Sequence, residues 1–103
     1  MMRYVRYAGE ELLTGDAIAE AVVQLAEALV ANHAAAHVSI PIQLVDGVVG
    51  EATLLVSPAT QLITLPGPRD VDELIDEQAV ALIRQRLTRF RQRRALDSSF
   101  DDL

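Results

Sequence analysis

The chain has 103 residues, half of them apolar and only four aromatic, and a formal net charge of −6. This length fits one domain with an aliphatic core. There is no cysteine and no lysine, since all nine basic residues are arginine. Disulfides, thiolate and Schiff-base catalysis, and phosphate loops that use lysine are therefore excluded. No run approaches the ~18 apolar residues of a membrane span, and no signal-peptide core is visible, so we expect a cytoplasmic protein.

The first half of the chain predicts a strand followed by a helix. Residues 3–7 alternate in polarity and predict a short strand, and residues 12–14 could return as a second one. Asp16 is a suitable N-cap for a helix that runs to the neighbourhood of residues 32–36. Its apolar stripe has helical spacing and consists of Ile18, Val22, Leu25 and Leu29.

Residues 37–56 predict a β-hairpin. Apolar and polar residues alternate before Asp46-Gly47, a pair that favours a tight turn, and the alternation resumes after it. Pro41 indicates that the first of these strands lies at an edge or carries a bulge, because proline has no amide to donate. A third strand follows over residues 61–65 and ends at Pro66-Gly67-Pro68.

A long second helix is expected to begin at Asp70 or Asp72 and to continue to about Arg94. Its apolar stripe is formed by Val71, Ile75, Ala79, Leu82, Ile83, Leu87 and Phe90. Residues 95–103 are acidic and contain serine, so we expect a disordered tail. The fold class is thus α+β over residues 1–94, an antiparallel three- to four-stranded sheet with two helices packed on one face, in the order β-α-β-β-β-α.

The far end of this second helix predicts a homodimer. A helix from Asp70 to Arg94 would be about 36 Å long and would overhang a narrow sheet. Leu87 and Phe90 would then need a partner surface, which a two-fold-related copy supplies. Arg86 lies on the same stripe. Its guanidinium either snorkels into water, which we favour, or forms an ion pair across the interface.

Six arginines follow within eleven residues and suggest a phosphate-binding surface: Arg84, Arg86, Arg89, Arg91, Arg93 and Arg94. The same helix begins with acidic residues, and acids at its start and arginines near its end match the helix dipole without any ligand. Helical spacing also scatters these arginines around the helix, and the net negative charge opposes the approach of DNA. We therefore favour a structural role for the cluster.

No catalytic or metal-binding constellation is evident. His33 and His37 have the spacing of two metal ligands on one helix face, but no third ligand is near in sequence. We prefer to interpret them as polar residues at a helix C-terminus. No serine lies in a nucleophile motif, and the glycines of the hairpin do not open a helix. We expect no cofactor, no metal and no enzymatic activity.

Two families resemble this chain. A first strand that contains Tyr4 and Tyr7, a helix, and strands that end at Ser57-Pro58-Ala59-Thr60-Gln61-Leu62 resemble small uncharacterised bacterial proteins of about this length. Some of these proteins carry the label ATP-dependent DNA ligase, but a chain without lysine has no adenylation nucleophile. The topology and the charge pattern of residues 72–89 are similar to those of YbaB-like nucleoid-associated dimers. This chain adds an N-terminal strand, and no site residue carries over from either family.

We therefore expect a small cytoplasmic homodimer that acts as a protein-interaction or structural module. The alternative is a nucleic-acid-associated dimer that uses the arginine-rich end of the second helix. An enzyme would require a site assembled between subunits, which spacing within one sequence does not reveal.

Overall fold

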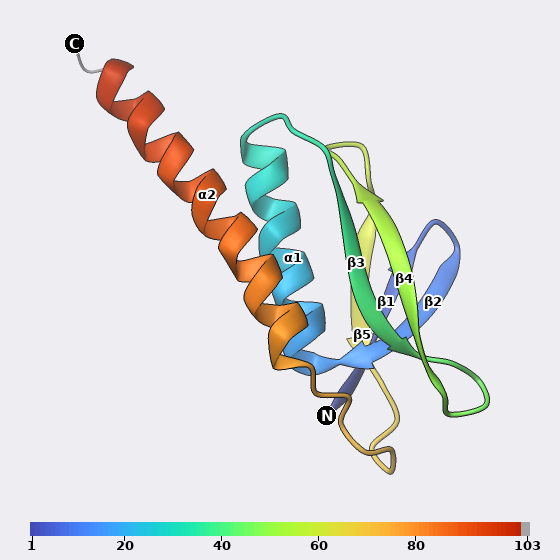
Figure 1. The fold of residues 1–103 in the computed structure, drawn as a ribbon. Coiled ribbons are helices and arrows are strands. Elements are labelled where there is room, and N and C mark those ends of the chain that lie inside the picture. Colours follow the sequence, from blue (N-terminus) through green and yellow to red (C-terminus); the bar gives the residue numbers. More distant parts are fainter. Residues whose placement is uncertain (102–103) are drawn as a thin grey trace.

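The structure is a computed structural model that describes the backbone of residues 1–101 and the side chains of residues 1–92. The elements follow the order β-β-α-β-β-β-α (Figure 1). Their bounds are β1 Met2–Tyr7, β2 Glu10–Gly15, α1 Asp16–Ala31, β3 Ala36–Gln43, β4 Val49–Val56, β5 Leu62–Pro66 and α2 Glu77–Asp101.

The predicted α+β class is confirmed, but the sheet has five strands, in the order β4-β3-β2-β1-β5, where we expected three or four. The additional strand is β2, which pairs with β1 along its whole length. Ala8 and Gly9 form the connecting turn, and both have positive φ angles, of 50° and 82°. Such a turn matches the right-handed twist of the two strands that it connects. β1 and β2 therefore pair although β2 begins with two acidic residues.

The predicted hairpin is confirmed. β3 pairs with β4 from Ala36↔Val56 to Gln43↔Val49. In the connecting loop Gly47 has a φ of +85°, and the Asp46 carboxylate accepts a hydrogen bond from the Val48 amide at 3.0 Å.

Pro41 does not place β3 at an edge, because β3 lies between β4 and β2 in the sheet. The two strands β2 and β3 nevertheless pair only at Leu13↔Gln43, so no backbone group of β2 is paired with Pro41. There the hydroxyl of Thr14, which is fully buried, donates to the Pro41 carbonyl at 2.7 Å. The missing amide of Pro41 therefore removes no bond from the sheet.

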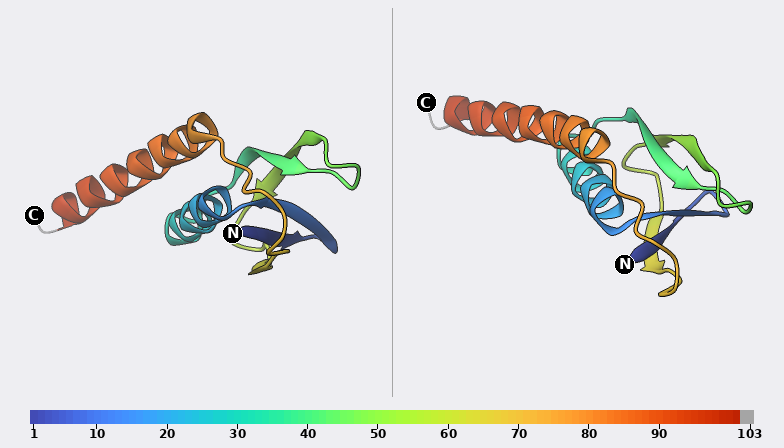
Figure 2. Two further views of the ribbon diagram at one scale, coloured as in Figure 1. Left: turned by 90° about the horizontal axis from the view of Figure 1, so that it is seen from below. Right: turned by 60° about the horizontal axis from the view of Figure 1, so that its bottom comes forward.

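The sheet curls until its β1 side approaches β4 (Figures 1 and 2). The Tyr7 hydroxyl, at the end of β1, donates to the Leu55 carbonyl at 3.0 Å and accepts from the Leu55 amide at 3.1 Å. A single phenol thus satisfies both outward-facing backbone groups of one residue on the outer strand.

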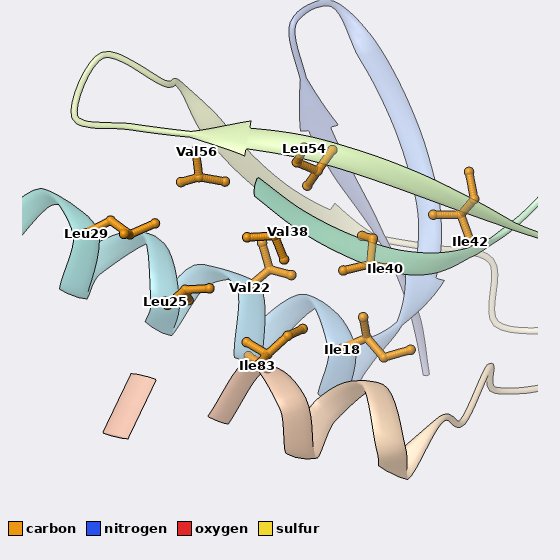
Figure 3. Packing of buried hydrophobic residues seen from close by; sticks show 11 residues of the cluster. Ile18, Val22, Leu25, Leu29, Val38, Ile40, Ile42, Leu54, Val56 and Ile83 are labelled. Atoms are coloured by element: carbon orange, nitrogen blue, oxygen red, sulfur yellow. The ribbon is translucent and has the colours of Figure 1, made fainter. Parts of the chain in front are cut away.

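The core lies between α1 and the sheet (Figure 3). The predicted stripe of α1 is buried against one face of the hairpin, formed by Val38, Ile40, Ile42, Leu54 and Val56. Burial of each such side chain contributes roughly 1.5–3 kcal/mol. The helix starts at Asp16 as expected, but Gly15 is the N-cap and the Asp16 carboxylate pairs with Arg3 instead of capping the helix.

The second helix differs from the prediction at both ends. It begins at Glu77, where the Asp76 carboxylate caps it by accepting from the Ala79 amide at 3.0 Å. Residues 67–76, expected in part to be helical, form an irregular segment. The helix continues past Arg94 to Asp101, and residues 102–103 of the expected disordered tail lie outside the described residues.

α2 packs mainly on α1 and contacts the sheet at β3, so α1 covers the sheet and α2 forms an outer layer (Figures 2 and 3). The two helices therefore do not share the sheet face in the way we predicted. The far part of α2 projects from the body, and the molecule measures 56 × 26 × 19 Å along its principal axes.

Candidate protein-interaction site

The segment 67–76 fixes where α2 begins. Glu73 lies over the start of α1, and its Oε1 accepts a hydrogen bond from the Asp16 amide at 2.6 Å. Its other oxygen forms an ion pair with the Met1 ammonium. Gly15 allows this close approach, because a Cβ there would lie 1.9 Å from the Leu74 carbonyl oxygen.

The pKa of Glu73 is lowered by these contacts. The largest cause is the hydrogen bond with the N-terminal ammonium, and the Asp16 amide acts in the same direction against the opposing effect of burial. The positive end of the α1 dipole also favours a carboxylate at this position. A carboxylate distant in sequence thus supplies the cap that Asp16 was expected to provide.

A groove of about 830 Å³ separates the first half of α2 from the hairpin. We call it the β3–α2 groove. One wall is formed by residues 37–41 of β3 with the start of β4, and the other by residues 76–89. The residues that bear on its chemistry are His37, Ser39, Pro41, Val49, Glu51, Asp76, Leu82, Arg86 and Arg89.

Backbone groups of β3 face this groove. The amide and carbonyl of Leu55 bond to Tyr7 and therefore point away from β3. Residues that face each other in an antiparallel pair share the same hydrogen-bonding pattern, so the amide and carbonyl of His37, opposite Leu55, point away from β4. Backbone direction alternates along a strand, so Ser39 and Pro41 face the same side as His37.

The neighbours of Ser39 on this side are already paired. The Arg86 guanidinium donates to the His37 carbonyl, and Thr14 donates to that of Pro41. Between them, the amide and carbonyl of Ser39 have no hydrogen-bond partner among the described residues. A short length of strand edge is therefore open to a ligand.

Apolar side chains are exposed in the groove and at the tip of the hairpin. Leu82 is 54% exposed and Val49 is 55% exposed within the groove. At the tip Val45 is fully exposed, Val48 is 57% exposed and Leu44 is also exposed. The Leu44 side chain packs over Gly50, where a Cβ would lie 3.0 Å from it.

Charges of opposite sign lie at the two ends of the groove. Arg86 and Arg89 are at the end where β3 begins, since Arg86 contacts His37. Asp76 precedes α2, and Glu51 pairs with Pro41 further along β3. The groove is thus basic near the start of β3 and acidic near Pro41.

The residues predicted at a dimer interface are largely satisfied within one protomer. Leu87 was placed at an interface because it was expected to be exposed. It is only 4% exposed within one protomer, so it requires no partner surface. Phe90 is partly buried against the core. Arg86 neither simply snorkels nor pairs with an acid, because it binds the His37 carbonyl.

The arginines of α2 face different surfaces. Arg89 lines the β3–α2 groove, Arg84 lines a hollow beside the start of α1, and Arg91 lines a smaller one beside the end of α1. The side chains of Arg93 and Arg94 lie outside the described residues. Arg86 lines the same groove as Arg89, so the four arginines of the cluster with described side chains are divided among three surfaces.

His33 and His37 do not share a helix face. His33 follows the end of α1 with a φ of 50°, and His37 lies in β3. Among the described residues there is no group of three or more His, Asp or Glu side chains arranged to hold a metal ion.

No family model, curated protein or solved structure matches the chain. Within the part of the chain that the structure describes, no helix is long and apolar enough to cross a membrane. The open edge at Ser39 was not predicted from the sequence, where Pro41 indicated an edge strand or a bulge. No sequence signal indicated that Leu82, on the apolar stripe, would stay exposed.

Proposed function

We propose that the protein is a cytoplasmic, homodimeric interaction module that acts through its surfaces and not through covalent chemistry. The observation that carries this proposal is the apolar hairpin tip, where Leu44, Val45 and Val48 are exposed together. Apolar side chains clustered at a protruding tip favour association with another protein surface. A two-fold arrangement would cover both tips at once.

Sedimentation equilibrium of the wild type and of a Val45→Asp/Val48→Asp variant tests the proposal. Both side chains are exposed, so the variant should fold, and we expect the wild type to be a dimer at tens of micromolar and the variant a monomer. Ile63→Asp, an exposed apolar position on β5, is the matched control and should stay dimeric. A monomeric wild type would refute the dimer.

If the Val45→Asp/Val48→Asp variant stays dimeric, the dimer interface does not include the hairpin tip. Phe90→Asp distinguishes this case, because loss of the dimer in that variant would restore the α2 interface predicted from the sequence.

Nucleic-acid association, the alternative function, has less support because the described arginines face separate surfaces. Binding to duplex DNA should be weak and lost at moderate salt. Affinity that survives about 200 mM salt and falls in Arg89→Ala would favour the alternative.

A further inference from the structure

We propose that the β3–α2 groove binds an extended peptide, which adds as a strand to the open side of β3 and runs antiparallel to it. The peptide would place an apolar side chain against Leu82 and acidic residues, toward its C-terminal end, beside Arg86 and Arg89. This site is separate from the hairpin tip, so the inference goes beyond self-association and does not depend on it.

The backbone of Ser39 is the first reason. Its amide and carbonyl point away from β4, to the side on which Arg86 of α2 binds the His37 carbonyl, and they have no partner among the described residues. On the same side the carbonyl groups of His37 and Pro41 are already bonded, to Arg86 and Thr14. In an antiparallel sheet one residue exchanges two hydrogen bonds with the residue opposite it. One peptide residue opposite Ser39 would satisfy both groups, as the Tyr7 hydroxyl satisfies both groups of Leu55 on the other side of the hairpin.

Two contacts fix the position of α2 beside β3. At one end Arg86 spans from α2 to the His37 carbonyl, and at the other Glu73 fixes the segment that leads into α2. Between these two contacts α2 and β3 are separated by the groove of about 830 Å³. A strand edge beside a helix is a recurring arrangement for recognition of extended peptides.

The charge pattern of the groove determines which end of an antiparallel peptide is acidic. The groove is basic near the start of β3 and acidic near Pro41, where Glu51 and Asp76 lie. A peptide antiparallel to β3 has its C-terminal end beside the start of β3. Acidic residues at that end would face Arg86 and Arg89, whereas acidic residues at the N-terminal end of the same peptide would lie against Glu51 and Asp76.

The apolar part of the peptide has a defined contact. Leu82 is 54% exposed on the helix wall of the groove, above the buried Ile83. Alternate side chains of an extended peptide point to opposite faces, so one apolar residue can cover Leu82 while its neighbours face solvent.

Selection from a phage-displayed library of random heptapeptides tests the proposal on the full-length protein. We expect enrichment of sequences with an apolar residue followed by Asp or Glu on its C-terminal side. Absence of enrichment would overturn the proposal, as would a selected set without this pattern.

Binding of one enriched, fluorescein-labelled peptide is then measured by anisotropy against two proline variants. Ser39→Pro removes an amide on the groove side of β3, as Pro41 already does on the same side of the strand, and should weaken binding about tenfold. It also removes the hydrogen bond between the Ser39 and Thr53 hydroxyls, which the control variant loses too. Thr53→Pro removes an outward amide from β4 on the opposite side of the hairpin and should leave affinity unchanged. Loss of binding in Thr53→Pro alone would show that the peptide adds to β4 and would overturn the proposal.

Circular dichroism checks that both variants fold. If Ser39→Pro does not, a peptide N-methylated at single backbone positions replaces it, and one position should lose affinity about tenfold while its neighbours do not. Arg89→Gln should weaken binding about threefold in a salt-sensitive manner, and Arg91→Gln, on another face of α2, should not. Equal binding by all N-methylated peptides would exclude strand addition.

Discussion

The two helices of this protein differ in composition and in position: α1 is largely apolar, whereas α2 carries a few apolar side chains among many charged and polar ones. α1 buries Ile18, Val22, Leu25 and Leu29 against the sheet. α2 is longer, yet among its described side chains only Ile83 and Leu87 are buried, and Leu82 is exposed. α1 therefore belongs to the core, whereas α2 is an outer layer whose other face is free to line a groove. The apolar stripe predicted for α2 therefore did not by itself identify a core helix, and the polar composition of α2 agrees with its outer position.

The largest expected effect separates the two helices directly. Leu25→Ala in α1 removes a fully buried side chain and should lower the free energy of unfolding by about 3–4 kcal/mol. Leu82→Ala makes the same change at an exposed position of α2 and should lower it by less than about 0.5 kcal/mol. Urea denaturation of both variants measures the difference. Equal losses would mean that α2 is as integral to the core as α1.

The anchor of α2 should give an intermediate effect. Leu87 is buried against α1, but it lies in the outer layer, where the helix can relax toward the space left by a smaller residue. Leu87→Ala should therefore cost about 2 kcal/mol, at the lower end of the range for buried leucines. Urea denaturation gives the value, and Arg91→Ala, exposed one turn further along, is the control. A negligible loss would show that α2 is not held at this point.

The sequence predicted those parts of the fold that depend on local signals. Helical spacing identified the buried face of α1, and Asp46-Gly47 located the turn of the hairpin. The start of α2 was wrong because Asp70 and Asp72 have the chemistry of N-caps, and nothing local shows that Glu73 is used by another helix. β2 was left out of the predicted order because its first residues are acidic and its apolar run is short.

The candidate site was less predictable than the fold. The divergence of Arg84 and Arg86 around the helix was expected from spacing and agrees with the surfaces that they line. The groove itself depends on how far α2 stands from β3, which follows from long-range contacts such as Arg86 to His37. Local patterns in a single sequence do not predict the separation between α2 and β3.

The contact that sets the start of α2 should give the smallest of these three effects. Glu73 is ionised more readily in the folded protein than in the unfolded chain, because its pKa is lowered by the N-terminal ammonium and the Asp16 amide. Its contribution to stability is therefore fully present above its ordinary pKa, about 4.3, and is lost as the pH falls through the lowered value. Glu73→Gln keeps the size of the side chain but removes the charge.

We expect Glu73→Gln to lower the free energy of unfolding by about 1 kcal/mol at pH 7, the usual value of a helix cap together with a partly exposed ion pair. The difference from the wild type should begin to shrink below about pH 4.3, the ordinary pKa of a glutamate. It should vanish once the pH falls below the lowered pKa of Glu73, because both side chains are then neutral. Asp72→Asn, the adjacent exposed acid, is the matched control and should show no such convergence. Thermal unfolding followed by circular dichroism between pH 7 and pH 3 measures both variants. A difference that is independent of pH would mean that packing of the segment 67–76, and not the Glu73 charge, holds the start of α2 beside α1.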